Sequence, residues 1–161
     1  MNIKIFVLHL AIVASAGLLF VNLYNSIVDA PNWAHQLPQS LNAARSYFSF
    51  KDPSAFLKFA GPVIHIIGIN CVIRFWRTDN KVRLYNITAL GMILCTDLMT
   101  FLFLFPLNQV LFGSSQDVTI IEHAVQQWSL LNWLRSLILA GVTTMYSLSL
   151  SRYYRLVLQS T

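Results

Sequence analysis

Three ionisable side chains lie inside long apolar stretches of the sequence. His65, Asp97 and Arg135 each fall near the middle of such a stretch. A charged side chain at the centre of a membrane helix costs about 2.5–3.5 kcal/mol on insertion scales, so residues of this kind are usually paired or functional. These three residues are therefore the candidate catalytic residues.

Four apolar runs must position them, at residues 3–28, 53–75, 84–107 and 125–150. Each run is long enough to cross a membrane as an α-helix, because about 20 residues span a hydrocarbon core of ~30 Å. Apolar residues make up 56% of the chain and charged residues 11%, whereas a soluble domain has about 25% charged residues. The sequence predicts an all-α fold, an integral membrane four-helix bundle forming one domain over residues 1–161.

Basic residues are divided unequally between the two sides of this bundle. One side carries Lys4, Arg74, Arg77, Lys81, Arg83, Arg152 and Arg155, and the other carries Arg45, Lys51 and Lys58. The positive-inside rule then places both termini in the cytoplasm. Residues 29–52 become an extracytoplasmic loop, in which residues 40–48 are expected to form a short interfacial helix. The chain is predicted to be a multi-pass protein of a bacterial inner membrane.

Partners and cofactors are only partly indicated by the sequence. The net charge of +5 comes from basic residues scattered at the ends of apolar runs, so it does not indicate a nucleic-acid partner. The expected partners are the lipid bilayer and a small lipophilic ligand, with a homo-oligomer or a membrane partner protein left open. Cys71 and Cys95 lie at different depths, so no disulfide is expected. No HExxH, CxxCH or Gly-rich phosphate loop is present, and no metal ligands are assigned. A bound quinone or haem is left open.

The three candidate catalytic residues share one depth. Each lies about ten residues, or ~15 Å, from the outer end of its run. A compact bundle would place Asp97 beside Arg135 as its counter-ion, with His65 as a third member. A purely structural ion pair is the competing interpretation for Asp97 and Arg135. For His65, the competing interpretation is that its ring only forms an ordinary hydrogen bond inside the membrane.

Further polar side chains recur at helical spacing near this depth. Trp128, Asn132 and Arg135 follow an i, i+4, i+7 pattern, which places them on one face of the fourth run. Asp97 and Thr100 are expected to share a face of the third run, which residues 106–108 should end. The candidate substrate-binding residues are Asn22, Asn25, Asp29, Trp33, Thr100, Asn108, Trp128 and Asn132.

These side chains predict a polar pocket in the outer half of the bundle, roofed by residues 29–52. Hydrogen bonds that merely join the helices are the alternative interpretation of the same amides. Trp33 and Trp128 would also fit an aromatic belt at the membrane interface.

Three segments resemble the anthrone oxygenase-like family of small four-span membrane proteins. They are residues 22–33, residues 105–108 with the family's P-x-N, and residues 127–136 with its W-x-x-x-N-x-x-R. The resemblance extends over nearly the whole chain. It implies a four-span fold. Most bacterial relatives have no assigned function, whereas fungal members use dioxygen to oxidise the activated methylene of an anthrone to an anthraquinone.

The resemblance implies a membrane oxidoreductase that oxygenates a lipophilic aromatic or quinol-type molecule. Asp97 or His65 would remove a proton from an acidic carbon, and Arg135, Asn132 and Asn108 would stabilise the oxyanion. The alternative is a non-catalytic bundle that binds a lipid, a quinone or a partner protein. In that case the outer loop, with Trp33 and Tyr47, would matter more than the buried charges. A transporter is disfavoured because no internal repeat is visible.

Overall fold

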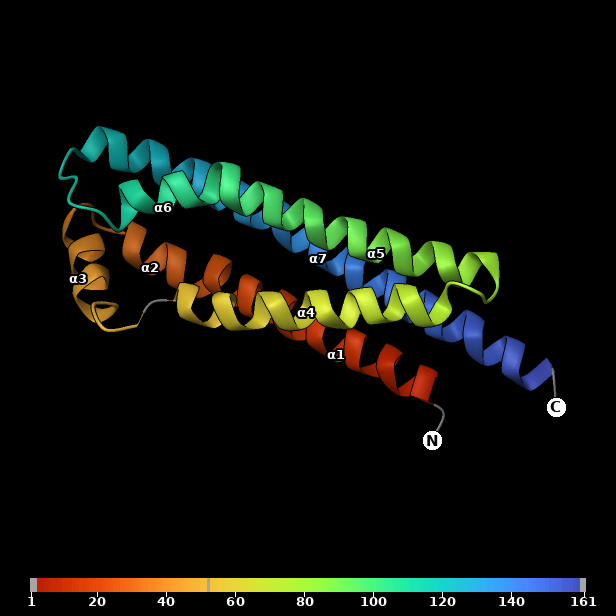
Figure 1. Cartoon of the computed structure of the whole chain (residues 1–161). Coiled ribbons are helices and arrows are strands. Elements are labelled where there is room, and N and C mark those ends of the chain that lie inside the picture. Colours follow the sequence, from red (N-terminus) through yellow and green to blue (C-terminus); the bar gives the residue numbers. More distant parts are fainter. Residues whose placement is uncertain (1–2, 52, 160–161) are drawn as a thin grey trace.

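A computed structural model of the chain describes residues 3–51 and 53–159. The described residues form helices joined by short connections, with four long helical segments side by side (Figure 1). The elements in chain order are α1 (Ile3–Tyr24), η1 (Asn25–Asp29), α2 (Ala30–Ala34), α3 (Gln39–Tyr47), α4 (Pro53–Phe75), α5 (Asn80–Met99), η2 (Thr100–Leu104), α6 (Phe105–Leu111) and α7 (Val118–Gln159). Here η1 and η2 are π-helical turns. The prediction of an all-α fold is confirmed.

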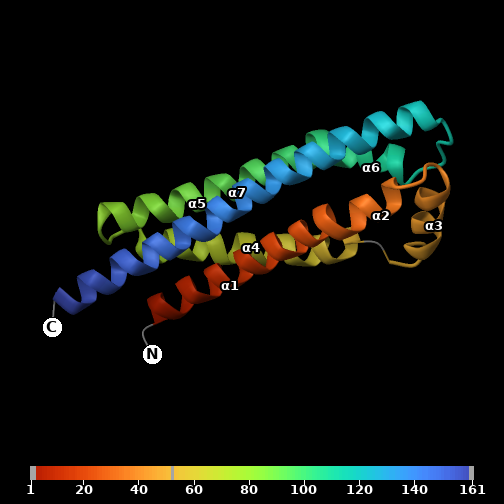
Figure 2. The ribbon, with the colours of Figure 1, turned by 180° about the vertical axis from the view of Figure 1, so that it is seen from behind.

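The long segments form a bundle in which α7 packs along both α1 and α5. On the other side, α4 packs against α1 and α5, so α4 and α7 lie diagonally opposite. Figures 1 and 2 show α3 across one end of the bundle and both chain ends at the other. We call these the α3 end and the terminal end.

Three of the long segments are apolar enough to cross a membrane, namely Ile3–Ala34, Pro53–Phe75 and Asn80–Leu111. The chain is therefore a multi-pass membrane protein. The predicted fourth span, residues 125–150, is not among these candidates. It lies within α7, where Asn132, Arg135 and several hydroxyl residues interrupt the apolar run.

Several of the predicted helix ends are wrong, and α7 runs from Val118 to Gln159 where residues 125–150 were predicted. The first long helix continues beyond residue 28 to Ala34, and the third continues through Pro106 to Leu111. A π-helical turn directly precedes the short helix in which each proline, Pro31 or Pro106, occupies the first turn. Proline lacks an N–H group and clashes with the carbonyl four residues earlier, so it normally ends or kinks a helix. In a π-helical turn, a backbone N–H bonds to the carbonyl five residues earlier instead of four. The carbonyls before the proline therefore have other partners, and the helix continues past the proline.

Buried apolar side chains form two clusters along the bundle. The terminal cluster consists of Val7, Leu8, Ala11, Ile64, Ile67, Cys71, Phe75, Val82, Ala89, Ile93, Val142 and Tyr146. The α3-end cluster consists of Ala30, Trp33, Leu41, Leu104, Leu111, Ile121, Ala124 and Trp128. Helix α4 contributes to the first cluster but not to the second. Cys71 is buried and Cys95 is exposed, and both are free thiols, as predicted.

Helix α3 confirms the short helix predicted in the outer loop, and Arg45 fixes it to the bundle. The Arg45 guanidinium donates to the carbonyl oxygens of Leu111 at 2.8 Å and Ser115 at 3.1 Å. It also reaches the carbonyl of Val110 at 3.4 Å. The last carbonyls of a helix have no partner within the helix, so a cation there both satisfies them and offsets the helix dipole.

Substituting Arg45 with alanine is expected to loosen α3. The change removes charge-assisted hydrogen bonds worth about 1.5–3 kcal/mol in total, so amides of residues 39–47 should exchange faster with deuterium while those of α4 keep their protection. Lys51→Ala removes an exposed cation that packs over Phe50, and it serves as the control. Equal exchange rates in wild type and Arg45→Ala would contradict this role for Arg45.

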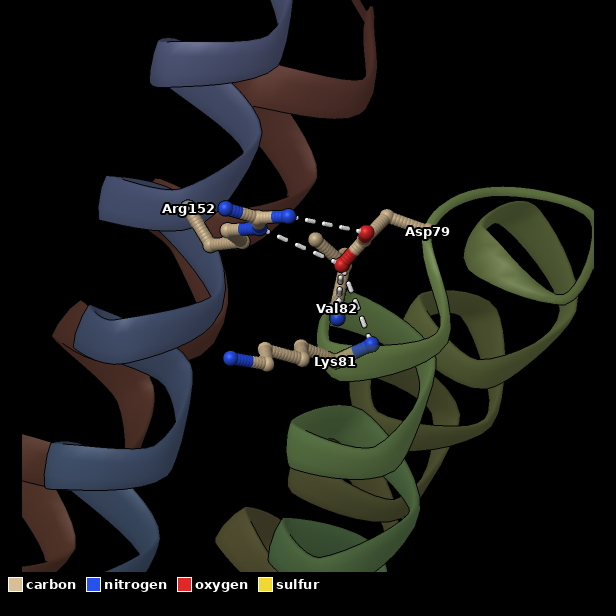
Figure 3. Close-up of polar contacts among 4 residues, drawn as sticks. All are labelled: Asp79, Lys81, Val82 and Arg152. Carbon is tan, nitrogen blue, oxygen red and sulfur yellow. Dashed lines mark hydrogen bonds and ion pairs between the residues drawn. The ribbon is translucent and has the colours of Figure 1, made fainter.

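At the terminal end, Asp79 joins the start of α5 to α7 (Figure 3). Its carboxylate accepts from the backbone N–H groups of Lys81 at 3.0 Å and Val82 at 3.3 Å, which caps α5. The same carboxylate accepts from Arg152, at 3.1 Å from Nη2 and 3.3 Å from Nε. Hydrogen bonding from Arg152 is the main reason that the pKa of Asp79 is lowered from its ordinary 3.8.

This lowered pKa predicts an acid-dependent contribution of Asp79 to stability. A carboxyl group with a depressed pKa in the folded state stabilises that state above its ordinary pKa, and the effect is lost as the pH falls through the folded value. We expect wild type to melt at a higher temperature than Asp79→Asn at neutral pH, and the gap to shrink below pH 3.8. Circular dichroism melts of both proteins in detergent measure it. A gap that is constant with pH would refute the assignment.

Candidate functional site

A layer of polar side chains separates the two apolar clusters. It consists of Asn22 of α1, Ser26 of η1, Thr100 of η2, and Asn132, Arg135 and Ser136 of α7. All of these except Thr100, which is half-buried, are buried. We call this set the polar layer. It lies where the two π-helical turns face α7, and π-helical turns often occur at functional sites.

Arg135 is the centre of the polar layer and is only 8% exposed. Its Nε donates to Asn22 Oδ1 at 2.7 Å, and its Nη2 donates to Asn132 Oδ1 at 2.6 Å. A longer contact of 3.4 Å joins Nη1 to the Thr100 hydroxyl. The guanidinium is thus held from three elements by neutral oxygen atoms.

Asn22 and Asn132 lock each other in place around Arg135. The Asn132 amide donates to Ser26 Oγ at 2.6 Å and to the Asn22 carbonyl at 3.3 Å. In return, the Asn22 amide donates to Ser136 Oγ at 2.6 Å and to the Asn132 carbonyl at 3.0 Å. Both amides therefore have donors and acceptor engaged within the protein. Their geometry suits positioning of Arg135 better than contact with a substrate.

The predicted ion pair between Asp97 and Arg135 is wrong. Among residues 3–51 and 53–159, Arg135 has no carboxylate within ion-pair distance. A guanidinium has five N–H donors, and the bonds to Asn22, Thr100 and Asn132 leave a further hydrogen on Nη1 and another on Nη2. A buried cation without a counter-ion costs several kcal/mol in a low-dielectric environment. The layer therefore presents an uncompensated positive charge.

Asp97 instead pairs with His65, at 2.7 Å between Oδ2 and Nε2. The other ring nitrogen, Nδ1, lies 2.7 Å from the Gly61 carbonyl oxygen and so must carry a hydrogen to donate there. A second hydrogen must then lie between Nε2 and Oδ2, because two lone pairs at this distance would repel. The pair therefore holds either an imidazolium with a carboxylate, or a neutral imidazole with a carboxylic acid.

His65 and Asp97 lie at one level along the bundle, as predicted. The orientation of α5 about its own axis, however, turns Asp97 away from Arg135. Asp97 and Thr100 are three residues apart, so their directions differ by about 60° around a helix axis. Because α5 lies between α4 and α7, Asp97 reaches His65 on α4 while Thr100 reaches Arg135 on α7. The expectation that Asp97 and Thr100 share a face is therefore wrong. The two sites lie about one helical turn apart along α5.

Three predicted residues form a second group between the polar layer and α3. Trp128 Nε1 donates to Asn108 Oδ1 at 2.8 Å, and the Trp33 and Trp128 rings meet edge to face at 5.4 Å. Trp33 is 5% and Trp128 8% exposed, so neither belongs to an interfacial belt. Trp33 is also too buried to serve as an exposed interaction surface on the outer loop.

Asn25 and Asp29 are not brought into either group. Of the hydrogen bonds among described residues, none joins their side chains to the polar layer, although Asn25 is buried and Asp29 half-buried. A π-helical turn contains more residues than an α-helical turn, so a stripe extrapolated at 3.6 residues per turn loses its register there. Asn22 and Ser26, before or at the start of this turn, do face Arg135.

The groups of the polar layer bond one another, and two hollows lie elsewhere on the described part of the chain. One hollow, of about 310 Å³, is lined by Ala34, His35, Leu37, Glu122, Val125 and Gln126 near the α3 end. Another lies at the terminal end. Neither is lined by the polar layer. Within the described ranges, no group of three or more His, Cys, Asp or Glu residues could hold a metal ion.

The candidate binding set omitted two hydroxyl residues, Ser26 and Ser136. Each lies four residues after an asparagine of the polar layer, on the same helical face. That spacing was a usable signal, but serines in apolar helices commonly bond their own backbone. Both serines do so here and accept from an amide as well.

Comparison with known proteins identifies a family but provides no characterised relative. No curated protein and no solved structure matches the chain. Residues 52–145 match the family described as anthrone oxygenase, which is more than half of the chain. The matched segment contains His65, Asp97 and Arg135, together with Trp128 and Asn132. The chain therefore belongs to the anthrone oxygenase family.

Proposed function

We propose that this protein is a membrane oxygenase that acts on a lipophilic aromatic substrate able to form an oxyanion, such as an anthrone or a quinol. The observation that carries the proposal is the buried guanidinium of Arg135 without a carboxylate partner among the described residues. Family membership supports the same class of reaction.

An uncompensated buried cation favours a substrate that becomes negatively charged. When an anthrone loses a proton from its methylene, the negative charge moves onto the carbonyl oxygen. Preorganised donors aimed at such an oxygen typically contribute about 3–4 kcal/mol to the barrier, because they need no rearrangement during the reaction. Asn22 and Asn132 supply this preorganisation by holding the Arg135 fork from two sides.

Asp97 is the group best placed to remove the proton. Asp97 pairs with His65 through Oδ2, and none of the hydrogen bonds or ion pairs among the described residues engages its Oδ1. The Asp97 and His65 side chains are 38% and 25% exposed. This exposure lies beside α4, whose outer half, residues 53–63, contributes no buried residue. A lipophilic substrate would approach this side from the bilayer.

The overall reaction balances without another reductant. A methylene group and one dioxygen molecule give one carbonyl group and one water molecule. After deprotonation, the substrate anion transfers an electron to dioxygen, and recombination forms a carbon–oxygen bond. The resulting hydroperoxide loses water, which breaks the oxygen–oxygen bond and leaves the new carbonyl. The protein's part is to remove the first proton, to stabilise the anion and to return a proton to the departing oxygen.

The proposal includes the arrangement in the membrane. Helix α7 would be the fourth span, because it packs along two apolar segments and its polar residues face them. The terminal end, with most of the basic residues, would face the cytoplasm.

Oxygen uptake by the purified full-length protein tests the proposal. With an anthrone substrate in mild detergent, we expect one dioxygen consumed for each anthraquinone formed, well above the rate without protein. A panel of anthrones and quinols defines the range of substrates. If these compounds bind but none is turned over, the non-catalytic alternative is favoured and the oxygenase proposal fails.

A further inference from the structure

A hollow at the terminal end lies far from the polar layer and has the chemistry of a phosphate site. Its volume is about 610 Å³, and it is lined by Lys4, Val72, Ile73, Arg74, Trp76 and Arg77. The lining comes from the start of α1, the end of α4 and the turn after it. We propose that this hollow binds the phosphate headgroup of an anionic phospholipid.

Three cations line the hollow from two different segments. Arg74 and Arg77 are exposed, and a guanidinium fork matches the oxygens of a phosphate. Lys4 is held at the rim by two aromatic rings, with its Nζ 5.6 Å from the Phe75 centroid and 5.9 Å from that of Tyr153. The Lys4 ammonium thus lies between a ring of α4 and a ring of α7.

Among the described residues, no carboxylate forms an ion pair with Arg74 or Arg77. Asp79 is occupied by Arg152 and by two backbone N–H groups (Figure 3). Basic pockets at the cytoplasmic ends of membrane helices are a recurrent form of headgroup site. The balance of charge in the hollow thus favours an anion.

The rest of the lining favours a lipid over a small soluble anion. Val72 and Ile73 give the hollow an apolar wall, and Ile73 is 68% exposed. The exposed residues Ile66 and Ile69 continue this apolar surface along α4 toward the membrane centre. Trp76 is positioned by Arg83, whose guanidinium lies 5.5 Å from the indole centroid, and tryptophan is typical of the headgroup level. An acyl chain could therefore follow α4 while its phosphate contacts the cations.

Lipid retention measured by native mass spectrometry tests this site. The full-length protein is prepared in mild detergent with phosphatidylglycerol or phosphatidylcholine. The double variant Arg74→Gln/Arg77→Gln removes two cations from the hollow. Lys81→Gln/Arg155→Gln, which removes the same charge from exposed positions outside the lining, is the matched control. Circular dichroism establishes that all proteins are folded.

We expect phosphatidylglycerol to bind wild type and control alike, and the Arg74/Arg77 variant about 25-fold more weakly, since each of the two basic residues near an anionic surface strengthens binding about fivefold. Phosphatidylcholine should bind all three equally weakly. Equal phosphatidylglycerol binding by both double variants would overturn the site. Displacement of the lipid by millimolar inorganic phosphate would overturn the lipid assignment in favour of a free phosphate.

Discussion

Replacing Arg135 with glutamine is expected to lower turnover of an anthrone substrate by about 10²–10³, the usual loss when one oxyanion donor is removed. The loss should fall mainly on the rate of turnover and less on KM, because the charge acts on an anion that forms during the reaction. Glutamine retains an amide that can donate to Asn22 or Asn132, so the polar layer keeps part of its bonding. Steady-state oxygen uptake measures the effect.

The controls for this variant separate charge from folding. Without the guanidinium, the Oδ1 atoms of Asn22 and Asn132 lose the Arg135 N–H groups that donate to them, and buried unsatisfied acceptors each cost about 1–3 kcal/mol. Arg135→Lys keeps the charge but not the fork and should retain an intermediate rate. Arg155→Gln, at an exposed position of α7, should behave like wild type. If folded Arg135→Gln turns over substrate normally, Arg135 has no role in the chemistry.

Replacing Asp97 with asparagine is expected to reduce turnover by about 10²–10⁴, the range typical of a lost general base. Asparagine has nearly the same shape and can still accept from His65, so the contact between α4 and α5 is largely preserved. The substrate should still bind, because the Arg135 layer is intact. Turnover and substrate binding, measured on the same preparation, distinguish these two effects.

Asp117→Asn is the matched control for this change. Asp117 caps the start of α7 through the backbone N–H groups of Thr119 and Ile120, and asparagine caps a helix about as well. His65→Asn should give a smaller loss than Asp97→Asn, because it removes the ring that positions Asp97 but leaves the Asp97 carboxyl group. Equal activity in Asp97→Asn and Asp117→Asn would assign the His65–Asp97 contact to structure alone.

Composition was enough to predict the fold class, and helical rise was enough to predict which residues share a depth. His65 and Asp97 do meet at the predicted level. Depth, however, says nothing about rotation around each helix, which depends on how α5 packs between α4 and α7. A shift of about 60° between Asp97 and Thr100 was sufficient to give Asp97 a different partner from the one predicted.

The positions of the helix ends and of α3 depended on features with no simple sequence signal. A proline usually indicates a helix boundary, and the π-helical turns that carry the chain past Pro31 and Pro106 were not predicted. Arg45 counted only as a charge on the outer side, yet it caps α6 from 66 residues away in sequence. Contacts of this range follow from tertiary packing, whereas the W-x-x-x-N-x-x-R spacing did place Asn132 beside Arg135.

The most direct measurement is the absorption spectrum of a bound anthrone under argon, where oxygenation cannot occur. If Asp97 removes the proton and Arg135 stabilises the oxyanion, wild type should convert the keto form to its coloured anion at neutral pH. The Asp97→Asn and Arg135→Gln variants should bind the neutral form, and Arg155→Gln should match wild type. A bound substrate that stays in its neutral form in wild type would contradict the proposed role of the buried cation.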